Sequence, residues 1–366
     1  MSKIIEKFTT PAVIATAVTN LDPDLPRLKS GKEFVADFTP PDYLIDGILQ
    51  RGYFYTLTAK TGHGKTAWGL LAGICTAAGI KLAEHDCHQG TVCFFAGENA
   101  DDVRARLIAT LDHLGLDIEN TPIHFFDQIL GIREHADYIA REVERIGGVA
   151  FVIVDSFAAF FAGEEENSNT EAGRYARDLR GLCSLPGNPT VLALAHPTKN
   201  PGRDSLVPRG GGAIIAEVDG NLRLWSDDFQ TTELHWCGKL RGPDFEPESY
   251  QMKPHTCAAL ANDKGNYPSV VAVPMTQGDI EQASKRVRSD ENALLDMMLN
   301  WPNGSIRTWC ESLGWISETG NPLKSKAQRA LAKLERDKLV KKERDRWVLT
   351  KTGRKEARDV LGKNPA

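Results

Sequence analysis

The chain has 366 residues, a length that favours two or three domains with enough apolar residues to form a core in each. No apolar run is long enough to span a bilayer, and the start of the sequence lacks the apolar stretch of a signal peptide, so we expect a cytoplasmic protein without membrane contact. Seven cysteines are scattered without CxxC pairs, which argues against a disulfide framework and a zinc ribbon.

Charge is unevenly distributed along the chain. The net charge is −5, but residues 285–366 hold nineteen Lys and Arg against eleven Asp and Glu, a net of +8. The remaining stretch therefore carries −13. This division predicts an acidic body followed by a basic domain, and a basic domain favours a polyanionic partner.

Residues 1–40 show no sustained periodicity and contain several prolines. We interpret them as an N-terminal extension, either an extended lead-in that could lie on a neighbouring subunit or a disordered tail. A short apolar segment, residues 43–49, then leads into the first predicted strand of the body.

Residues 53–58 are aromatic and β-branched and predict a buried strand, and residues 67–72 predict a helix. The loop between them, AKTGHGKT, is typical of a phosphate cradle, in which backbone amides and the helix N-terminus face an anion. Lys65 would reach the outer phosphates and the Thr66 hydroxyl would hold Mg²⁺. Ala59 replaces the usual first glycine, which is compatible with the cradle if its φ stays negative. The predicted nucleotide-binding residues are Lys60, Thr61, Gly62, His63, Gly64, Lys65 and Thr66.

Two carboxylates follow apolar strands downstream of this loop. Residues 90–96 predict a strand that leads to Glu98, which could polarise a water aimed at a γ-phosphate or could simply favour the dipole of the next helix. His85, Cys87 and His88 cluster between the first predicted helix and this strand, but a polar loop explains them better than a metal site. The unbroken apolar run 149–154 ends at Asp155, where a second Mg²⁺ contact would lie beside Thr66.

The next strand, residues 190–195, ends at His196, which could sense the γ-phosphate or play a structural role. An acidic loop, 157–170, and a Gly/Pro-rich loop, 200–212, flank this strand, and the second contains Arg203 and Arg209. Two further strands follow near residues 222–225 and 232–236. Alternating strands and helices followed by this hairpin predict an α/β fold, a mostly parallel sheet with antiparallel edge strands.

The basic tail predicts three helices and a two-stranded hairpin, the order of a winged helix-turn-helix domain. Its third helix and its hairpin tip carry the residues that we expect to bind DNA, although winged helices also serve as protein docks. These residues are Lys324, Lys326, Arg329, Lys333, Arg344 and Arg346. The predicted organisation is an extension over 1–40, an ATPase domain over 41–250, a linker over 251–284 and a winged helix over 285–366.

Several motifs occur together in one order: AKTGHGKT, Gly97-Glu98-Asn99, the strand ending in Asp155-Ser156, HPTK from His196, RGGGA from Arg209 and KLRGP from Lys239. As a set they resemble the RecA-like hexameric P-loop AAA-type ATPases, specifically the plasmid replicative helicases of the RepA type and their phage and mobile-element relatives. The resemblance covers about residues 40–250 and implies an ATP site between neighbouring subunits of a ring. It also implies that DNA passes through the central channel of this ring.

The resemblance also implies roles for particular residues. Glu98 would be the catalytic carboxylate and His196 the γ-phosphate sensor, acting with Lys65. Lys239 and Arg241 resemble a pair that acts on the neighbouring subunit's site, and Arg223 is the alternative arginine finger. The loops 157–170 and 200–212 would line the channel, with Arg203 and Arg209 meeting single-stranded DNA.

These features favour a Mg²⁺–ATP-dependent, ring-forming homo-oligomer, a hexamer, that acts on DNA as a replicative-type helicase. The alternative is a DNA-binding ATPase that does not unwind, such as a helicase loader, an initiator or an ATP-switched regulator. A regulator with a vestigial ATPase and a protein-docking winged helix is a third hypothesis. The acidic first channel loop keeps the second hypothesis open, whereas the complete set of acid, sensor and finger argues against the third.

Overall fold

The computed structural model describes residues 27–36, 38, 40, 42–161, 169–199, 201–226, 231–263, 265–317 and 320–363, without the side chains of 284–288 and 359–363. The chain divides into two units, residues 1–41 and 42–366. In the first unit, the short helix α3, Gly31–Val35, is capped by Ser30, whose hydroxyl accepts a hydrogen bond from the amide of Glu33. Most of the predicted N-terminal extension, residues 1–26, lies outside the described residues.

The second unit contains a nine-stranded sheet with the order β13-β10-β9-β8-β3-β7-β6-β4-β5. The strands from β8 to β5 run parallel to one another, whereas β9, β10 and β13 pair antiparallel at one side. The predicted mostly parallel sheet with antiparallel edge strands is therefore confirmed. The strands are β3, Phe54–Ala59; β4, Val92–Ala96; β5, Ile123–Phe126; β6, Phe151–Asp155; β7, Thr190–Ala195; β8, Gly220–Ser226; β9, Thr231–Leu240; β10, Glu248–His255; and β13, Ser269–Pro274.

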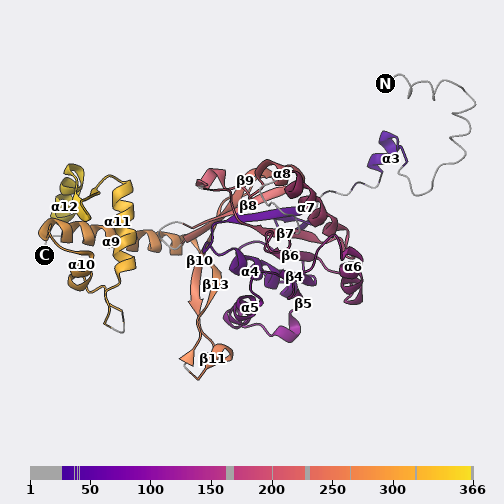
Figure 1. Ribbon diagram of the computed structural model, residues 1–366, viewed down its shortest axis with the longest axis horizontal. Helices are drawn as coiled ribbons and strands as arrows, with labels where there is room; N and C mark the ends of the chain where they lie inside the picture. The colour runs from indigo at the N-terminus through magenta and orange to yellow at the C-terminus, as the bar shows by residue number, and fades with distance from the viewer. Residues whose placement is uncertain are drawn as a thin grey trace, which may run out of the picture. The chain divides into compact units, whose positions relative to one another are not determined.

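Helices cover both faces of this sheet, with α4 and α5 on one side and α7 and α8 on the other (Figure 1). The central strands are buried on both faces because successive side chains enter different cores. Ile153 of β6 packs in the core beside α4, whereas its neighbours Val152 and Val154 pack in the core beside α7. The helices are α4, Lys65–Ala78; α5, Ala100–Leu114; α6, Ala136–Arg145; α7, Asn169–Gly181; and α8, Gly211–Glu217. The 3-10 turns are η2, Ile118–Asn120; η3, Leu182–Ser184; η4, Arg203–Ser205; and η5, Ala258–Leu260.

Three small strand pairs lie outside this sheet. The predicted apolar lead-in forms β1 and β2, and a second hairpin interrupts the chain between β10 and β13. The third belongs to the C-terminal elements described below. The pairs are β1, Tyr43–Ile45, with β2, Leu49–Gln50; β11, Ala261–Asn262, with β12, Gly265–Asn266; and β14, Val340–Glu343, with β15, Arg346–Leu349.

The linker predicted over residues 251–284 is wrong for most of its length. The second half of β10 and all of β13 belong to the main sheet and pair from Tyr250 opposite Pro274 to His255 opposite Ser269. Helix α9, Gln277–Asn300, follows after one short connection and begins with a capping box between Thr276 and Asp279. Prolines and glycines between the short apolar stretches of this region hide the alternation that would otherwise indicate strands.

The C-terminal elements match the predicted order of helices and hairpin. They are the end of α9, then α10, Ile306–Ser312; α11, Lys324–Arg336; the β14–β15 hairpin; and α12, Lys351–Lys363. Ser305 caps α10 as predicted. Leu294, Trp309 and Leu331 anchor a separate core in which α12 also takes part. Sequence reasoning assigned no element to α12.

None of the described helices is long and apolar enough to cross a membrane.

Candidate nucleotide site

The phosphate loop connects the end of β3 to the start of α4. Ala59 is the last residue of β3, and its φ is not positive. Alanine therefore fits at a position where glycine is usual. Gly62 and Gly64 have φ of 82° and 88°, in the left-handed region that other residues rarely adopt. A Cβ on Gly64 would lie 2.4 Å from Cε of Met252, so a larger residue there would also displace the end of that side chain.

Lys65 is the first residue of α4, and its side chain is buried. Its ammonium donates one hydrogen bond, 3.3 Å long, to the carbonyl of Ala59. Burial lowers the pKa of Lys65, while Asp155 and Glu98 oppose that effect. A buried ammonium whose one direct partner is a neutral carbonyl group is suited to bind an anionic ligand such as a nucleotide phosphate.

Asp155 ends β6 and is 3% exposed. Burial raises the pKa of Asp155 to about 6, although a hydrogen bond with Thr66 acts in the opposite direction. Its Oδ1 atom is buried and has no hydrogen-bond partner among the described residues. An orphaned carboxylate oxygen beside a threonine hydroxyl fits Mg²⁺, which prefers oxygen ligands. The described residues contain no cluster of three His, Cys, Asp or Glu side chains, so water and phosphate oxygens would complete such a site.

Glu98 lies two residues beyond β4, where β4, β6 and β7 end side by side. Its Oε1 atom accepts a hydrogen bond of 2.5 Å from the Ser156 hydroxyl and lies 3.2 Å from Nε2 of His196. The contact with His196 is the main reason why the pKa of Glu98 falls to about 2. Glu98 is therefore ionised at neutral pH and is suited to orienting a water through hydrogen bonds rather than to removing its proton outright.

The alternative interpretation of Glu98, an acid that favours the next helix, loses its support. Asn99 is the N-cap of α5, and its side-chain oxygen accepts hydrogen bonds from the amides of Asp101 and Asp102. Those two acidic residues also occupy the first helical turn, where they favour the helix dipole. Glu98 is thus left to face Ser156, which sequence reasoning did not assign to the site.

Trp225, near the end of β8, is a further neighbour of the phosphate loop, and no sequence motif had singled it out. The Lys60 ammonium lies 4.5 Å from the centroid of its ring, and the His63 ring lies 6.0 Å away. The backbone amide of Ser226 donates a hydrogen bond to Nδ1 of His63. Burial lowers the pKa of His63, which favours the neutral imidazole that can accept this bond. The end of β8 therefore positions the phosphate loop.

A family model described as an AAA domain matches residues 23–202. The chain has an α/β P-loop fold with a mostly parallel central sheet. Among solved structures, the KaiC-like protein PH0186 from the hyperthermophilic archaeon Pyrococcus horikoshii OT3 is similar at 19% sequence identity and a TM-score of 0.41, over 63% of this chain and 94% of that one. No curated protein matches the chain.

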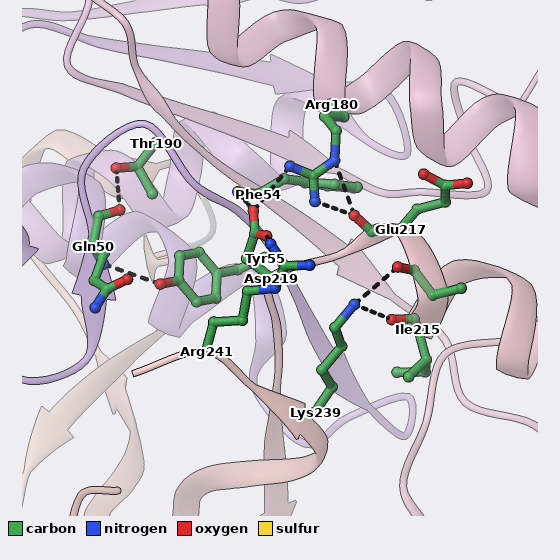
Figure 2. A network of polar contacts seen from close by, with 11 residues as sticks. Gln50, Phe54, Tyr55, Arg180, Thr190, Ile215, Glu217, Asp219, Lys239 and Arg241 are labelled. Carbon is green, nitrogen blue, oxygen red and sulfur yellow. Dashed lines mark hydrogen bonds and ion pairs between the residues drawn. The ribbon is translucent and has the colours of Figure 1, made fainter. Parts of the chain in front are cut away.

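Lys239 and Arg241 lie at the other edge of the sheet, around the buried Asp219 (Figure 2). Asp219 accepts a hydrogen bond from the amide of Phe54 and pairs with Arg241 at 3.1 Å and with Arg180 at 3.0 Å. Lys239 donates to two carbonyls at the end of α8, those of Ile215 and Ala216. Burial is the largest cause that lowers the pKa of Lys239, and the nearby Arg241 acts in the same direction.

This network cannot reach the phosphate loop of its own chain. Asp219 bonds to Phe54, the first residue of β3, whereas the loop follows Ala59, the last. Six residues of parallel strand separate the two edges by roughly 17 Å. Neither Lys239 nor Arg241 is therefore brought to Lys65, Glu98 or Asp155 within one subunit.

Arg223, the alternative finger, is engaged inside the domain. Its side chain is 5% exposed and pairs with Glu233 of β9 at 2.9 Å. Arg203 of the 200–212 loop contacts the same carboxylate. The loop is also held by Asn221, whose side-chain amide donates to the carbonyl of Leu206. Arg223 is thus placed as an anchor for this loop, and reaching a neighbour would require it to break a buried ion pair.

The six predicted DNA-binding residues of the C-terminal elements separate into two groups. Lys326 pairs with Asp290 at 2.9 Å, and Lys333 pairs with Glu291 at 3.0 Å, so both lysines face α9. The other four are exposed and belong to α11 or to the hairpin: Lys324, Arg329, Arg344 and Arg346. Of the predicted channel loops, Arg209 in 200–212 is partly buried, while residues 162–168 of the acidic loop lie outside the described residues.

Proposed function

We propose that this protein is a Mg²⁺–ATP-dependent, ring-forming DNA motor, a replicative-type helicase of a plasmid, phage or other mobile element. The observation that carries the proposal is the separation of its site residues between two edges of one sheet. Lys65, Asp155 and Glu98 lie at one edge. Lys239 and Arg241 lie at the other, where only a second subunit's nucleotide could meet them.

The residues at the first edge divide the chemistry of phosphoryl transfer to water. Amides of the phosphate loop and the buried Lys65 hold the β- and γ-phosphates. Thr66 and Asp155 hold Mg²⁺, which when bound neutralises charge on the phosphate oxygens. Glu98 orients the attacking water. His196 contacts Glu98 and can report whether the γ-phosphate is present.

The residues at the second edge support the proposal of a ring. A subunit that offers Arg241 to one neighbour and its phosphate loop to the other makes a head-to-tail contact, and such contacts close into a ring when the rotation permits. Arg241 is suited to leave its own domain because its side chain is 61% exposed while that of Asp219 is 3% exposed. We infer a hexamer from the resemblance of the motifs to hexameric helicases.

DNA would meet two parts of the chain. The loop 200–212 with Arg209 would face single-stranded DNA in the channel. The C-terminal elements would form a winged helix that binds duplex DNA through exposed cations of α11 and the hairpin, including Lys324 and Arg346. The net charge of +8 over residues 285–366 supports a polyanionic partner for this domain.

A strand-displacement assay on forked DNA tests the proposal. The wild-type protein should separate the strands only with ATP and Mg²⁺, and single-stranded DNA should stimulate its ATP turnover. A Lys65→Ala variant serves as the matched control because it removes the central phosphate contact without touching the DNA-binding elements. ATP turnover without any displacement, on forks of either polarity, would contradict the helicase assignment.

One observation favours a second candidate, a DNA-binding ATPase that does not unwind, such as a loader, an initiator or an ATP-switched regulator. Arg203 of the proposed channel loop is paired with Glu233, so this loop offers less free positive charge than a tight grip on single-stranded DNA requires. This candidate predicts ATP-dependent changes in duplex affinity in the assay above, with no strands released.

A further inference from the structure

A line of basic side chains runs along one face of α12. Its residues occur at the spacing i, i+3, i+4 and i+7, which places them on a single face of a helix. All four are exposed, and no ion pair joins any of them to a carboxylate in the described part of the chain. We call these residues the α12 stripe: Lys351, Arg354, Lys355 and Arg358.

The stripe forms one wall of an open groove of about 810 Å³. The other wall is the β14–β15 hairpin, from which Lys341 adds a fifth cation. Among the described side chains, Glu343 is the one acidic residue that lines the groove, and it pairs with Lys341 at 2.5 Å. The groove therefore keeps the four positive charges of the α12 stripe after this pair has formed.

The orientation of the stripe is fixed by the opposite face of α12. Ala357 is buried in the core, and Gly353 packs so closely that a Cβ there would lie 1.9 Å from the carbonyl oxygen of Leu339. The hydroxyl of Thr350 accepts a hydrogen bond from the amide of Gly353 and donates to the carbonyl of Lys338. Helix and hairpin are thus joined into one rigid support, so the groove is present before a ligand arrives.

We propose that this groove binds the phosphate backbone of duplex DNA, and that it contributes more to DNA affinity than α11 and the hairpin tip. The inference rests on the DNA-binding part of the proposed function and names the surface responsible. The stripe extends about 10 Å along the helix axis, the rise of roughly three nucleotides of one strand. By contrast, four basic residues of α11 were predicted to contact DNA, and two of them already pair with acidic residues of α9.

Other anionic partners fit the groove less well. A membrane-surface helix exposes an apolar face beside its cations, whereas Ala357, on the opposite face of α12 from the stripe, is buried in the domain core. Protein interfaces favour aromatic anchors and disfavour lysine, whereas this groove has no aromatic residue in its described lining, and half of its lining residues are lysine or arginine. A nucleic-acid backbone requires only regularly spaced cations.

The test compares two variants of the full-length protein that each lose four positive charges. The first neutralises the α12 stripe: Lys351→Gln, Arg354→Gln, Lys355→Gln and Arg358→Gln. The second neutralises the exposed cations of α11 and the hairpin: Lys324→Gln, Arg329→Gln, Arg344→Gln and Arg346→Gln. Fluorescence anisotropy with a labelled duplex is measured from low to moderate salt, and thermal unfolding checks that each protein is folded. If the first variant is unstable, the pair Lys351→Gln and Lys355→Gln replaces it.

The stripe variant should bind duplex DNA at least about tenfold more weakly at low salt, and its log–log salt slope should fall by up to about 3.6, nearly one for each lost contact. The second variant should lose less on both measures. Equal losses, or a larger loss in the second variant, would overturn the groove assignment while leaving DNA binding intact. A wild-type protein that does not bind DNA, or binds only phosphatidylserine vesicles, would overturn the DNA-binding function as well.

Discussion

The buried carboxylates at the two edges of the sheet, which are formed by the carboxyl and the amino ends of the parallel strands, have opposite environments. At the carboxyl edge, Asp155 has an oxygen without a hydrogen-bond partner, and burial raises its pKa to about 6. At the amino edge, Asp219 is equally buried but accepts a hydrogen bond from Phe54 and pairs with Arg180 and Arg241. The difference separates a carboxylate reserved for a ligand from one that organises the fold.

This contrast also assigns different roles to the cations. Lys65 has one weak hydrogen bond to a carbonyl, so a phosphate would relieve its burial. Arg241 already has a carboxylate partner but remains 61% exposed, so it can serve the fold within its own subunit and a nucleotide in the next. The site residues on the first edge lack partners that a ligand would supply, whereas those on the second already have partners within their own chain.

Replacing Lys65 with alanine should produce the largest effect. We expect ATP turnover to fall by about 10²–10³-fold, since the charge on the transferring phosphate loses its nearest cation. Thermal stability should be unchanged or slightly higher, because a desolvated ammonium is removed. Lys81→Ala is the control, as that ammonium is 57% exposed and pairs with Asp86. Near-normal turnover in the Lys65 variant would end the phosphate-loop assignment.

Asp219→Ala should affect stability most strongly. Removing this carboxylate leaves the buried amide of Phe54 and two guanidinium groups without their partner, and we expect a loss of about 3 kcal/mol in the free energy of unfolding. Asp219→Asn keeps an acceptor for the amide and should lose less. Urea denaturation measures both. Equal, small losses in the two variants would show that the network adds little to stability.

Glu98→Gln should keep ATP binding and lose turnover by about 10²-fold, because the amide preserves shape without the charge that orients the water. The variant Ser156→Ala sharpens the test, since it removes one hydrogen bond to Glu98 and leaves the carboxylate in place. Its turnover should fall by much less. A steady-state ATPase assay with saturating ATP compares the three proteins, and unchanged turnover in Glu98→Gln would remove this residue from the catalytic set.

The smallest predicted effect is a pH dependence. Asp155 must be ionised to hold Mg²⁺, and its pKa is raised to about 6, so protonation below pH 6 competes with the metal. Between pH 7.5 and pH 5 the Mg²⁺-dependent part of nucleotide affinity should fall about tenfold, as roughly one pKa unit of protonation implies. Titration calorimetry at each pH, compared with Asp155→Asn, isolates this contribution. Parallel pH profiles for the two proteins would contradict it.

Local patterns were sufficient to predict the first edge. Asp155 is the last residue of an apolar strand and Glu98 lies two residues beyond another, and parallel strands bring their carboxyl ends together. Asp219 had no comparable signal because its partners Phe54 and Arg180 are distant in sequence. β13 was missed for a related reason, since only pairing with β10 reveals it as part of the sheet.

The basic tail shows the same limit of sequence reasoning. Its helices and hairpin could be predicted from periodicity, but the direction of each cation could not. Lys326 and Lys333 share α11 with Arg329, yet acidic residues of α9 pair with the two lysines. The stripe on α12 was overlooked because this helix follows the three helices and the hairpin that were predicted for the domain. Long side chains on an amphipathic helix take their partners from tertiary packing.

The central claim is that each ATP site combines the first edge of one subunit with the second edge of the next. Arg241→Ala protein lacks the contribution in trans but keeps an intact phosphate loop, whereas Lys65→Ala protein has the reverse defect. Each should be inactive alone. Mixed under conditions where subunits exchange, they should recover ATP turnover that depends on the mixing ratio and peaks at intermediate composition. A mixture no more active than the sum of its two components would contradict the shared site.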